Sequence, residues 1–240
     1  MSLLWMIVIA LVVMKISVFC TTIYLHRTLT HRGMEVHPAV AFLFHLHLTL
    51  FTGISPREWV AVHRKHHQYS DKEGDPHSPY LLGLWKVLFG NAFYYRRVAK
   101  DPVAVRKYTP DYKGTVIDRI PGQGYGIVLG TVIFSLVFGS WPWGICLFIA
   151  QAIAYILLNS SINSICHVVG YRNFDNLATN VRLIALITGG EGLHNNHHEY
   201  PTSAHFAMGR FEVDTAWPII RTLEKLGLAR VKRIPVAKAA

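Results

Sequence analysis

Cysteine is scarce in this sequence, with three residues in a chain of 240. None of the three has a partner at a paired spacing, which argues against a disulfide framework. The sequence also lacks an internal repeat and a low-complexity linker, so we expect one domain over residues 1–240. Its first apolar run has neither a basic leader nor a small-residue cleavage site, so a cleaved signal peptide is not expected.

Acidic residues are few as well: 14 Asp and Glu stand against 24 Lys and Arg, which gives a net charge of +10. Such an excess can indicate binding to nucleic acid. Here the basic residues are spread through the segments between apolar runs, which is the distribution that the positive-inside rule describes for membrane proteins. With 51% hydrophobic residues and a mean hydropathy of +0.27, the sequence predicts an integral membrane protein without a nucleic-acid partner.

Histidine, by contrast, is abundant, with 14 residues. The pattern H-x-x-H-H occurs twice, starting at His63 and at His194. Residues at i, i+3 and i+4 share one face of a helix, so the three rings of each pattern project together and can bind metal ions. A pair and a single residue add further candidates, and nine imidazoles are too many for one ion, so we expect two. The nine candidate ligands are His26, His31, His63, His66, His67, His167, His194, His197 and His198.

The first pair, His26 and His31, has an unusual spacing. Five residues on a regular helix correspond to an angular offset of about 140°. Unless the helix is distorted, the two rings face different directions. We therefore expect this pair to reach two different metal ions.

Apolar runs define the expected membrane topology. Residues 3–25, 124–140 and 143–161 are predicted to cross the bilayer. A single crossing by 36–54 would place the first histidine pair and the first triplet on opposite sides. This run is therefore expected to be re-entrant or interfacial, and the aromatic, amphipathic run 80–97 to be interfacial. The predicted fold is an all-α integral membrane protein with about three transmembrane helices and a cytoplasmic, histidine-rich cap that holds a dinuclear metal site.

Several polar residues are expected to support the metal ligands. Glu191 and Asn195 lie beside the second triplet and are placed to orient ligand rings. Asp75 has two interpretations: a carboxylate that balances the charge of the metals, or a turn former before Pro76.

The motifs HRTLTHR, EWVAVHRKHH, DPHSP, NSICHVVGYR and GGEGLHNNHH resemble the histidine boxes of the membrane fatty acyl desaturases, the stearoyl-CoA desaturase group. Bacterial Δ9 acyl-lipid and acyl-CoA members are the most similar, and the resemblance covers roughly residues 20–230. It implies that all nine histidines bind two iron ions, which zinc can replace in recombinant protein. It also implies that Asn163 reaches one metal through water and that Trp59 lies near the bend of an acyl tunnel.

The resemblance further implies insertion of a cis double bond, at Δ9, into a saturated acyl chain with O2 and two electrons. The carrier of that chain is a phospholipid, coenzyme A or acyl carrier protein. The present sequence differs from the animal enzymes because it begins at the helix that carries the first histidine pair. The four-helix count and the coenzyme A contacts of those enzymes are therefore not carried over to it. A fused cytochrome b5-like domain is not expected, and the expected donor is a separate ferredoxin or cytochrome b5-like protein with its reductase.

The expected location is the bacterial inner membrane, with the active site on the cytoplasmic side. Two other functions remain open. A membrane diiron hydroxylase would use the same cluster but add an oxygen atom to the product. A histidine-rich metal transporter or metal-binding membrane protein would place ionisable residues near mid-membrane, whereas the histidine patterns here lie at span ends and in polar segments.

Overall fold

The computed structural model describes residues 1–120 and 124–232. Its first long helical unit consists of α1 (Leu3–Cys20), which continues directly into a π-helix, η1 (Thr21–Thr30). The other long helix is α8 (Trp141–Val168). Each unit is 28 residues long and apolar overall, which exceeds the ~20 residues needed to cross a bilayer. These helices cover the spans expected at 3–25 and 143–161, and both continue beyond the expected end into the histidine-bearing region.

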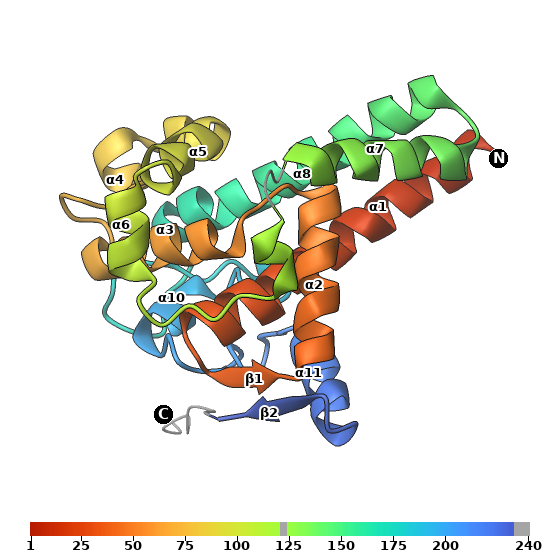
Figure 1. Cartoon of the computed structure of the whole chain (residues 1–240). Coiled ribbons are helices and arrows are strands. Elements are labelled where there is room, and N and C mark those ends of the chain that lie inside the picture. The colour runs from red at the N-terminus through yellow and green to blue at the C-terminus, as the bar shows by residue number, and fades with distance from the viewer. Residues whose placement is uncertain (121–123, 233–240) are drawn as a thin grey trace.

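The remaining expected span, 124–140, corresponds to the apolar helix α7 (Gly124–Phe138). With 15 residues, α7 is shorter than a full crossing. It packs along α8, and Figure 1 shows α1, α7 and α8 side by side in a bundle that extends away from the rest of the molecule. Among the described residues, two helices have the length and composition of a membrane span, and the bent pair α2 and α3 can add a third.

That bent pair is α2 (Pro38–Phe51) and α3 (Pro56–Tyr69). The two helices meet at 91°, because the chain turns at Gly53, whose φ of +65° favours glycine. α2 lies across α1 and α7 (Figure 1). Its contact with α7 is close, since a Cβ added at Gly130 would lie 2.0 Å from the carbonyl oxygen of Leu50. The bend directs α3 into the histidine-rich end of the molecule.

Short helices connect α3 to α7. They are α4 (Pro79–Leu82), α5 (Leu84–Ala99), α6 (Pro102–Tyr108) and the 3-10 helix η2 (Val116–Arg119). α5 packs against α3 and α8 and covers most of the run 80–97 that was expected to be interfacial. Trp85, Phe89 and Phe93 recur at every fourth position and are exposed. An exposed apolar stripe of this kind fits a helix that lies on lipid.

The C-terminal part adds α9 (Arg182–Ile187), α10 (His194–Glu199) and α11 (Trp217–Lys225). Two three-residue strands, β1 (Met34–Val36) and β2 (Ala229–Val231), pair antiparallel. The fold is therefore mostly helical rather than all-α. The sheet joins segments almost 200 positions apart, and three residues are too few for the alternation that marks a strand in a sequence.

Candidate metal centre

Five of the nine candidate histidines converge at one point. Their ligand-capable nitrogens all lie within 4.8 Å of one another. The rings come from η1 and its C-cap, from α3 and from α10. This five-histidine group consists of His26, His31, His63, His67 and His197.

The other four candidates form a second group under the same 4.8 Å limit. They come from α3, α8 and α10. This four-histidine group consists of His66, His167, His194 and His198. The structure thus brings all nine residues together, as two adjacent donor sets.

Each H-x-x-H-H pattern contributes to both groups. In α3, His63 and His67 (i and i+4) join the five-histidine group, whereas His66 (i+3) joins the four-histidine group. In α10 the division is reversed, and only the i+3 residue, His197, joins the five-histidine group. Successive residues of a helix are about 100° apart, so positions i+3 and i+4 fall on opposite sides of position i. Each helix can therefore supply ligands to two neighbouring metal positions.

The rings of His26 and His31 do not point in the directions that were predicted from the sequence. Because Thr21–Thr30 is a π-helix, hydrogen bonds join residues five apart, and the His31 amide donates to the His26 carbonyl oxygen over 3.1 Å. Residues five apart then face the same way. Both rings lie in the five-histidine group, with centroids 4.8 Å apart. The two rings therefore face one group and not two, because this segment is a π-helix and not the regular helix that the expectation assumed.

The distances between ring nitrogens fit bound metal ions. In the five-histidine group, the Nε2 atom of His197 lies 3.0 Å from that of His26 and 2.9 Å from that of His67. In the four-histidine group, the Nε2 atoms of His194 and His167 are 3.1 Å apart. Two imidazole nitrogens about 2.0–2.1 Å from a common ion, at a right angle, are separated by about 2.9 Å.

The protonation state of the rings leads to the same conclusion. A neutral imidazole has one N–H, so a ring whose Nδ1 donates a hydrogen bond presents a lone pair at Nε2. The Nε2 atom of His66 is buried and has no hydrogen-bond partner among the described residues. Converging buried lone pairs repel one another unless a cation lies between them. The donor sets therefore fit two metal ions.

Three buried carboxylates orient ligand rings. The Nδ1 atom of His26 lies 2.7 Å from Glu191, that of His66 lies 3.0 Å from Asp75, and that of His167 lies 2.6 Å from Asp71. Each contact fixes a ring so that its Nε2 atom points into one of the two groups. The alternative in which Asp75 only forms a turn is therefore incomplete, because Asp75 contacts a candidate ligand directly.

Burial and neighbouring rings disfavour the charged form of two ligands of the four-histidine group. Burial, followed by the repulsion of adjacent histidines, lowers the pKa of His194 and His198 well below its usual value. Burial alone would raise the pKa of Asp75 and Glu191, but the hydrogen bond and charge of the neighbouring histidine outweigh it and hold both pKa values below their usual range. An ionised carboxylate behind a ligand ring supports the binding of a cation by that ring.

A buried ion-pair network supports Glu191. The guanidinium of Arg27 donates to Asp214 over 2.8 Å and lies 3.6 Å from Glu191. The same guanidinium lies 3.8 Å from the ring centroid of Phe206. Gly190 lets the backbone approach closely, since a Cβ there would lie 2.5 Å from a carboxylate oxygen of Asp214. This network is fully buried and connects η1 to the segment before α10.

The other residues named from the sequence have different surroundings. Trp59, one turn before His63, stacks on that ring with centroids 4.7 Å apart. Asn163 lies on α8, one turn before His167, and is half-buried. Asn195 is buried, but its side chain accepts from the Asn173 and Phe174 amides and donates to the Ala178 carbonyl. Its hydrogen bonds therefore hold the loop 173–178 against α10 rather than orient a ligand ring.

Two residues of the site were missed. Asp71 orients His167 across 96 positions of sequence. His77 is buried, with its ring centroid 4.8 Å from that of His66 and both ring nitrogens unpaired among the described residues. His66, Asp75 and His77 also form a further group of possible ligands. Both missed residues lie in the stretch DKEGDPHSP, where an acidic, histidine-containing turn directly follows the first H-x-x-H-H helix.

The fold and the site together define a helical membrane protein with a buried, histidine-rich metal centre at one end of its long helices. The fatty acid desaturase family model matches residues 3–230. The chain belongs to the fatty acid desaturase family, which confirms the resemblance of its histidine motifs.

The individual relatives that the chain resembles are also fatty acyl desaturases by name. The chain is 34% identical over 233 residues to an acyl-CoA C20 Δ5-desaturase of Anemone leveillei, which covers 91% of this chain and 70% of the relative. It is 31% identical over 219 residues to an sn-1 stearoyl-lipid 9-desaturase of Synechocystis (89% and 67%), and 29% identical over 223 residues to Δ9 acyl-lipid desaturase 2 of Arabidopsis thaliana (89% and 70%). The protein is therefore an enzyme, an oxidoreductase that acts on fatty acyl chains.

Proposed function

We propose that this enzyme inserts a cis double bond into a saturated acyl chain at the Δ9 position, using O2, two electrons and two iron ions. The observation that carries the proposal is the convergence of nine histidines, six of them buried and three partly buried, into two adjacent groups at one end of apolar helices. Two of the relatives described above act at Δ9 and one at Δ5, as their names state. The Δ9 position is therefore the part of the proposal that most needs a measurement.

The proposed reaction is –CH2–CH2– + O2 + 2 e⁻ + 2 H⁺ → –CH=CH– + 2 H2O. The two iron ions, when bound, supply the oxidising chemistry, because unactivated methylenes offer no acidic or basic group to a side chain. The histidines hold the ions, and Asp71, Asp75 and Glu191 keep their rings in the required orientation. Zinc can occupy the same nitrogen ligands in recombinant protein.

The protein's other contributions are to position the acyl chain and to shield the metal centre from water. Trp59 stacks on His63 and packs with Tyr24 and Leu29 in one apolar cluster, so we assign it to the wall of the acyl path. Asn163 is assigned to hold a water beside the four-histidine group, one turn from His167. Reducing equivalents are supplied by a separate ferredoxin or cytochrome b5-like protein. We place the metal centre on the cytoplasmic side of a bacterial inner membrane.

Fatty acid methyl ester analysis tests the proposal. The chain is expressed in a host without its own desaturase, together with an electron donor, and the double-bond position of any new acid is determined. We expect a cis-Δ9 monounsaturated acid that is absent from a His197→Ala control. A hydroxylated acid would instead identify a membrane diiron hydroxylase. Iron-loaded protein that forms no new lipid with a competent donor would contradict the proposal.

A further inference from the structure

A groove of about 1180 Å³ lies between α2, the segment 112–120 and the start of α7. None of the nine histidines of the metal centre lines it. Its outer wall is fixed in place: the Nδ1 atom of His45 lies 2.7 Å from the hydroxyl of Thr115, and Arg57 donates to the hydroxyl of Thr109 over 3.1 Å. The groove is thus a built feature of the fold and not a gap beside a loose loop.

The carboxylates in the groove are already paired. Glu35 lies 2.6 Å from the ammonium group of Lys232. Asp118 accepts hydrogen bonds from the Thr115 amide over 2.7 Å and from the Tyr112 hydroxyl over 3.0 Å. Glu35 is therefore neutralised by Lys232, and Asp118 keeps its charge but is turned toward Thr115 and Tyr112.

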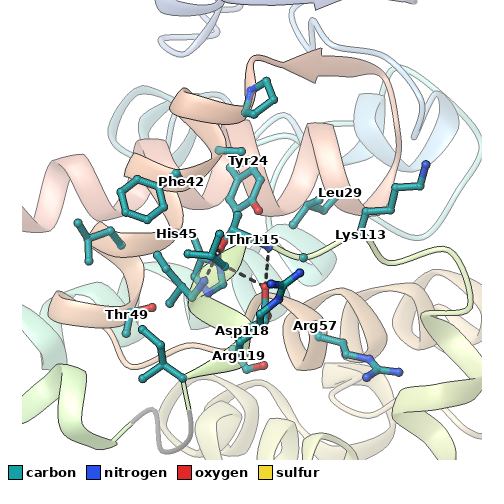
Figure 2. Close-up of a pocket in the computed structure, with 18 of the residues that line it drawn as sticks. Tyr24, Leu29, Phe42, His45, Thr49, Arg57, Lys113, Thr115, Asp118 and Arg119 are labelled. Carbon is teal, nitrogen blue, oxygen red and sulfur yellow. Dashed lines mark hydrogen bonds and ion pairs between the residues drawn. The ribbon is translucent and has the colours of Figure 1, made fainter.

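The cations of the groove are not paired. Arg57, Lys113 and Arg119 line it, and none of them has a carboxylate partner among the described residues. Figure 2 shows Arg57 and Lys113 on one side of the groove, and Phe42 and Thr49 on the other. The groove therefore has three cationic side chains and one acidic one that is not paired with a cation, which leaves an excess of positive charge.

The opposite side is apolar and exposed. Phe42 of α2 and Tyr125 and Leu129 of α7 line the groove, and 38%, 75% and 52% of their respective surfaces are exposed. α7 belongs to the apolar bundle, so this side of the groove continues onto the surface that meets lipid. A molecule already in the bilayer can therefore enter the groove sideways.

Packed side chains connect the wall of the groove to the metal centre. Tyr24 and Leu29 form part of its wall and belong to the same apolar cluster as Trp59. Trp59 in turn stacks on His63, a member of the five-histidine group. An acyl chain that passes from the groove along Trp59 would therefore reach the metal centre.

We propose that this groove holds the head end of a membrane phospholipid, with its phosphate beside Arg57, Lys113 and Arg119 and its saturated acyl chain directed past Trp59. This inference rests on the proposed desaturase function and specifies the substrate as an intact lipid. The positive charge fits a phosphate, and the exposed apolar side favours a phosphate-bearing molecule that is already in the bilayer over a carrier that approaches through water.

Photocrosslinking with the full chain in lipid nanodiscs tests the inference. The probe is a phosphatidylglycerol whose saturated acyl chain carries a diazirine near its head end, and peptide mapping locates the adducts. The test variant is Arg57→Gln/Lys113→Gln/Arg119→Gln, and the matched control is Lys86→Gln/Lys100→Gln/Lys225→Gln, three exposed cations outside the groove. We expect adducts in α2, 112–120 or α7, an about tenfold lower yield in the test variant and an unchanged yield in the control. Equal metal content in all three proteins establishes that they are folded.

Three results would overturn the inference: adducts outside the groove, an undiminished yield in the test variant, or complete displacement of the probe by soluble stearoyl-coenzyme A. Double-bond formation is measured in the same samples, supplied with O2 and with the electron donor that supports activity in the expression host. Adducts in the groove without any double bond would contradict the desaturase function and leave the lipid site intact. Double bonds formed from stearoyl-coenzyme A without adducts in the groove would support the desaturase function and contradict the lipid site.

Discussion

The two histidine groups share α3 and α10 but are supported differently. The five-histidine group takes one ring from η1 and one from its C-cap, and it has one carboxylate behind it, Glu191, which also faces Arg27. The four-histidine group takes one ring from α8 and has two carboxylates behind it, Asp71 and Asp75. The position with fewer neutral ligands thus has more negative charge close by. Ligand number and nearby charge compensate each other, which lets two inequivalent sites hold similar cations.

The largest expected effect comes from removing a ligand. We expect His63→Ala or His197→Ala to lower desaturation more than about a hundredfold, which exceeds the cost of losing a ligand's hydrogen-bond partner. The protein should remain in the membrane fraction, because the apolar helices are untouched. Product analysis by gas chromatography measures the change, and His37→Asn, outside both groups, serves as the control. Full turnover by either alanine variant would refute the site.

The metal content of single-histidine variants tests whether the two histidine groups differ in how strongly they bind metal. His194→Ala leaves three rings in the four-histidine group, whereas His31→Ala leaves four in the other. We expect His194→Ala to lose close to one metal ion per chain and His31→Ala to retain most of both. Elemental analysis of purified protein gives the stoichiometry. Equal losses would show that the extra ring does not strengthen the five-histidine group.

The carboxylates are expected to have a smaller effect. Asp71→Asn keeps the size of the side chain but weakens the orientation of His167, and we expect metal affinity to fall about 10–100-fold at one of two ions. Glu191→Gln should act on the other ion and also lower the melting temperature, because Arg27 loses a nearby charge. Competition with a chelator measures the first effect, with exposed Asp175→Asn as the control. A loss of both ions in Asp71→Asn would mean that the groups are not independent.

The smallest effect is expected at Trp59. Trp59→Phe keeps an aromatic ring on His63 but reduces the stacked area, and aromatic pairs contribute about 0.5–1.5 kcal/mol. We expect a several-fold loss of activity and a broader distribution of double-bond positions. Product analysis of both properties tests this, with Trp85→Phe on the exposed face of α5 as the control. An unchanged product pattern would argue against a place for Trp59 in the acyl path.

Much of the organisation could be predicted from the sequence, because it is written in local patterns. Two long apolar runs predicted α1 and α8, and the repeated H-x-x-H-H predicted helices with rings on one face. The motifs also led to the family, which the comparisons confirm. The length of α7 was overestimated, since hydropathy alone does not show that the chain turns at Gly139, whose φ is +64°.

The amino-acid sequence by itself determined which residues can bind metal, because ligand chemistry belongs to the residue and helical spacing is a local property. The tertiary structure alone decided how those ligands divide. The π-helix at Thr21–Thr30 turns His26 and His31 to the same group, and the pairing of His167 with Asp71 spans 96 positions. The groove of Arg57, Lys113 and Arg119 likewise exists only where α2, α7 and the segment 112–120 meet. Contacts between distant segments depend on packing of the whole chain, and no local pattern encodes them.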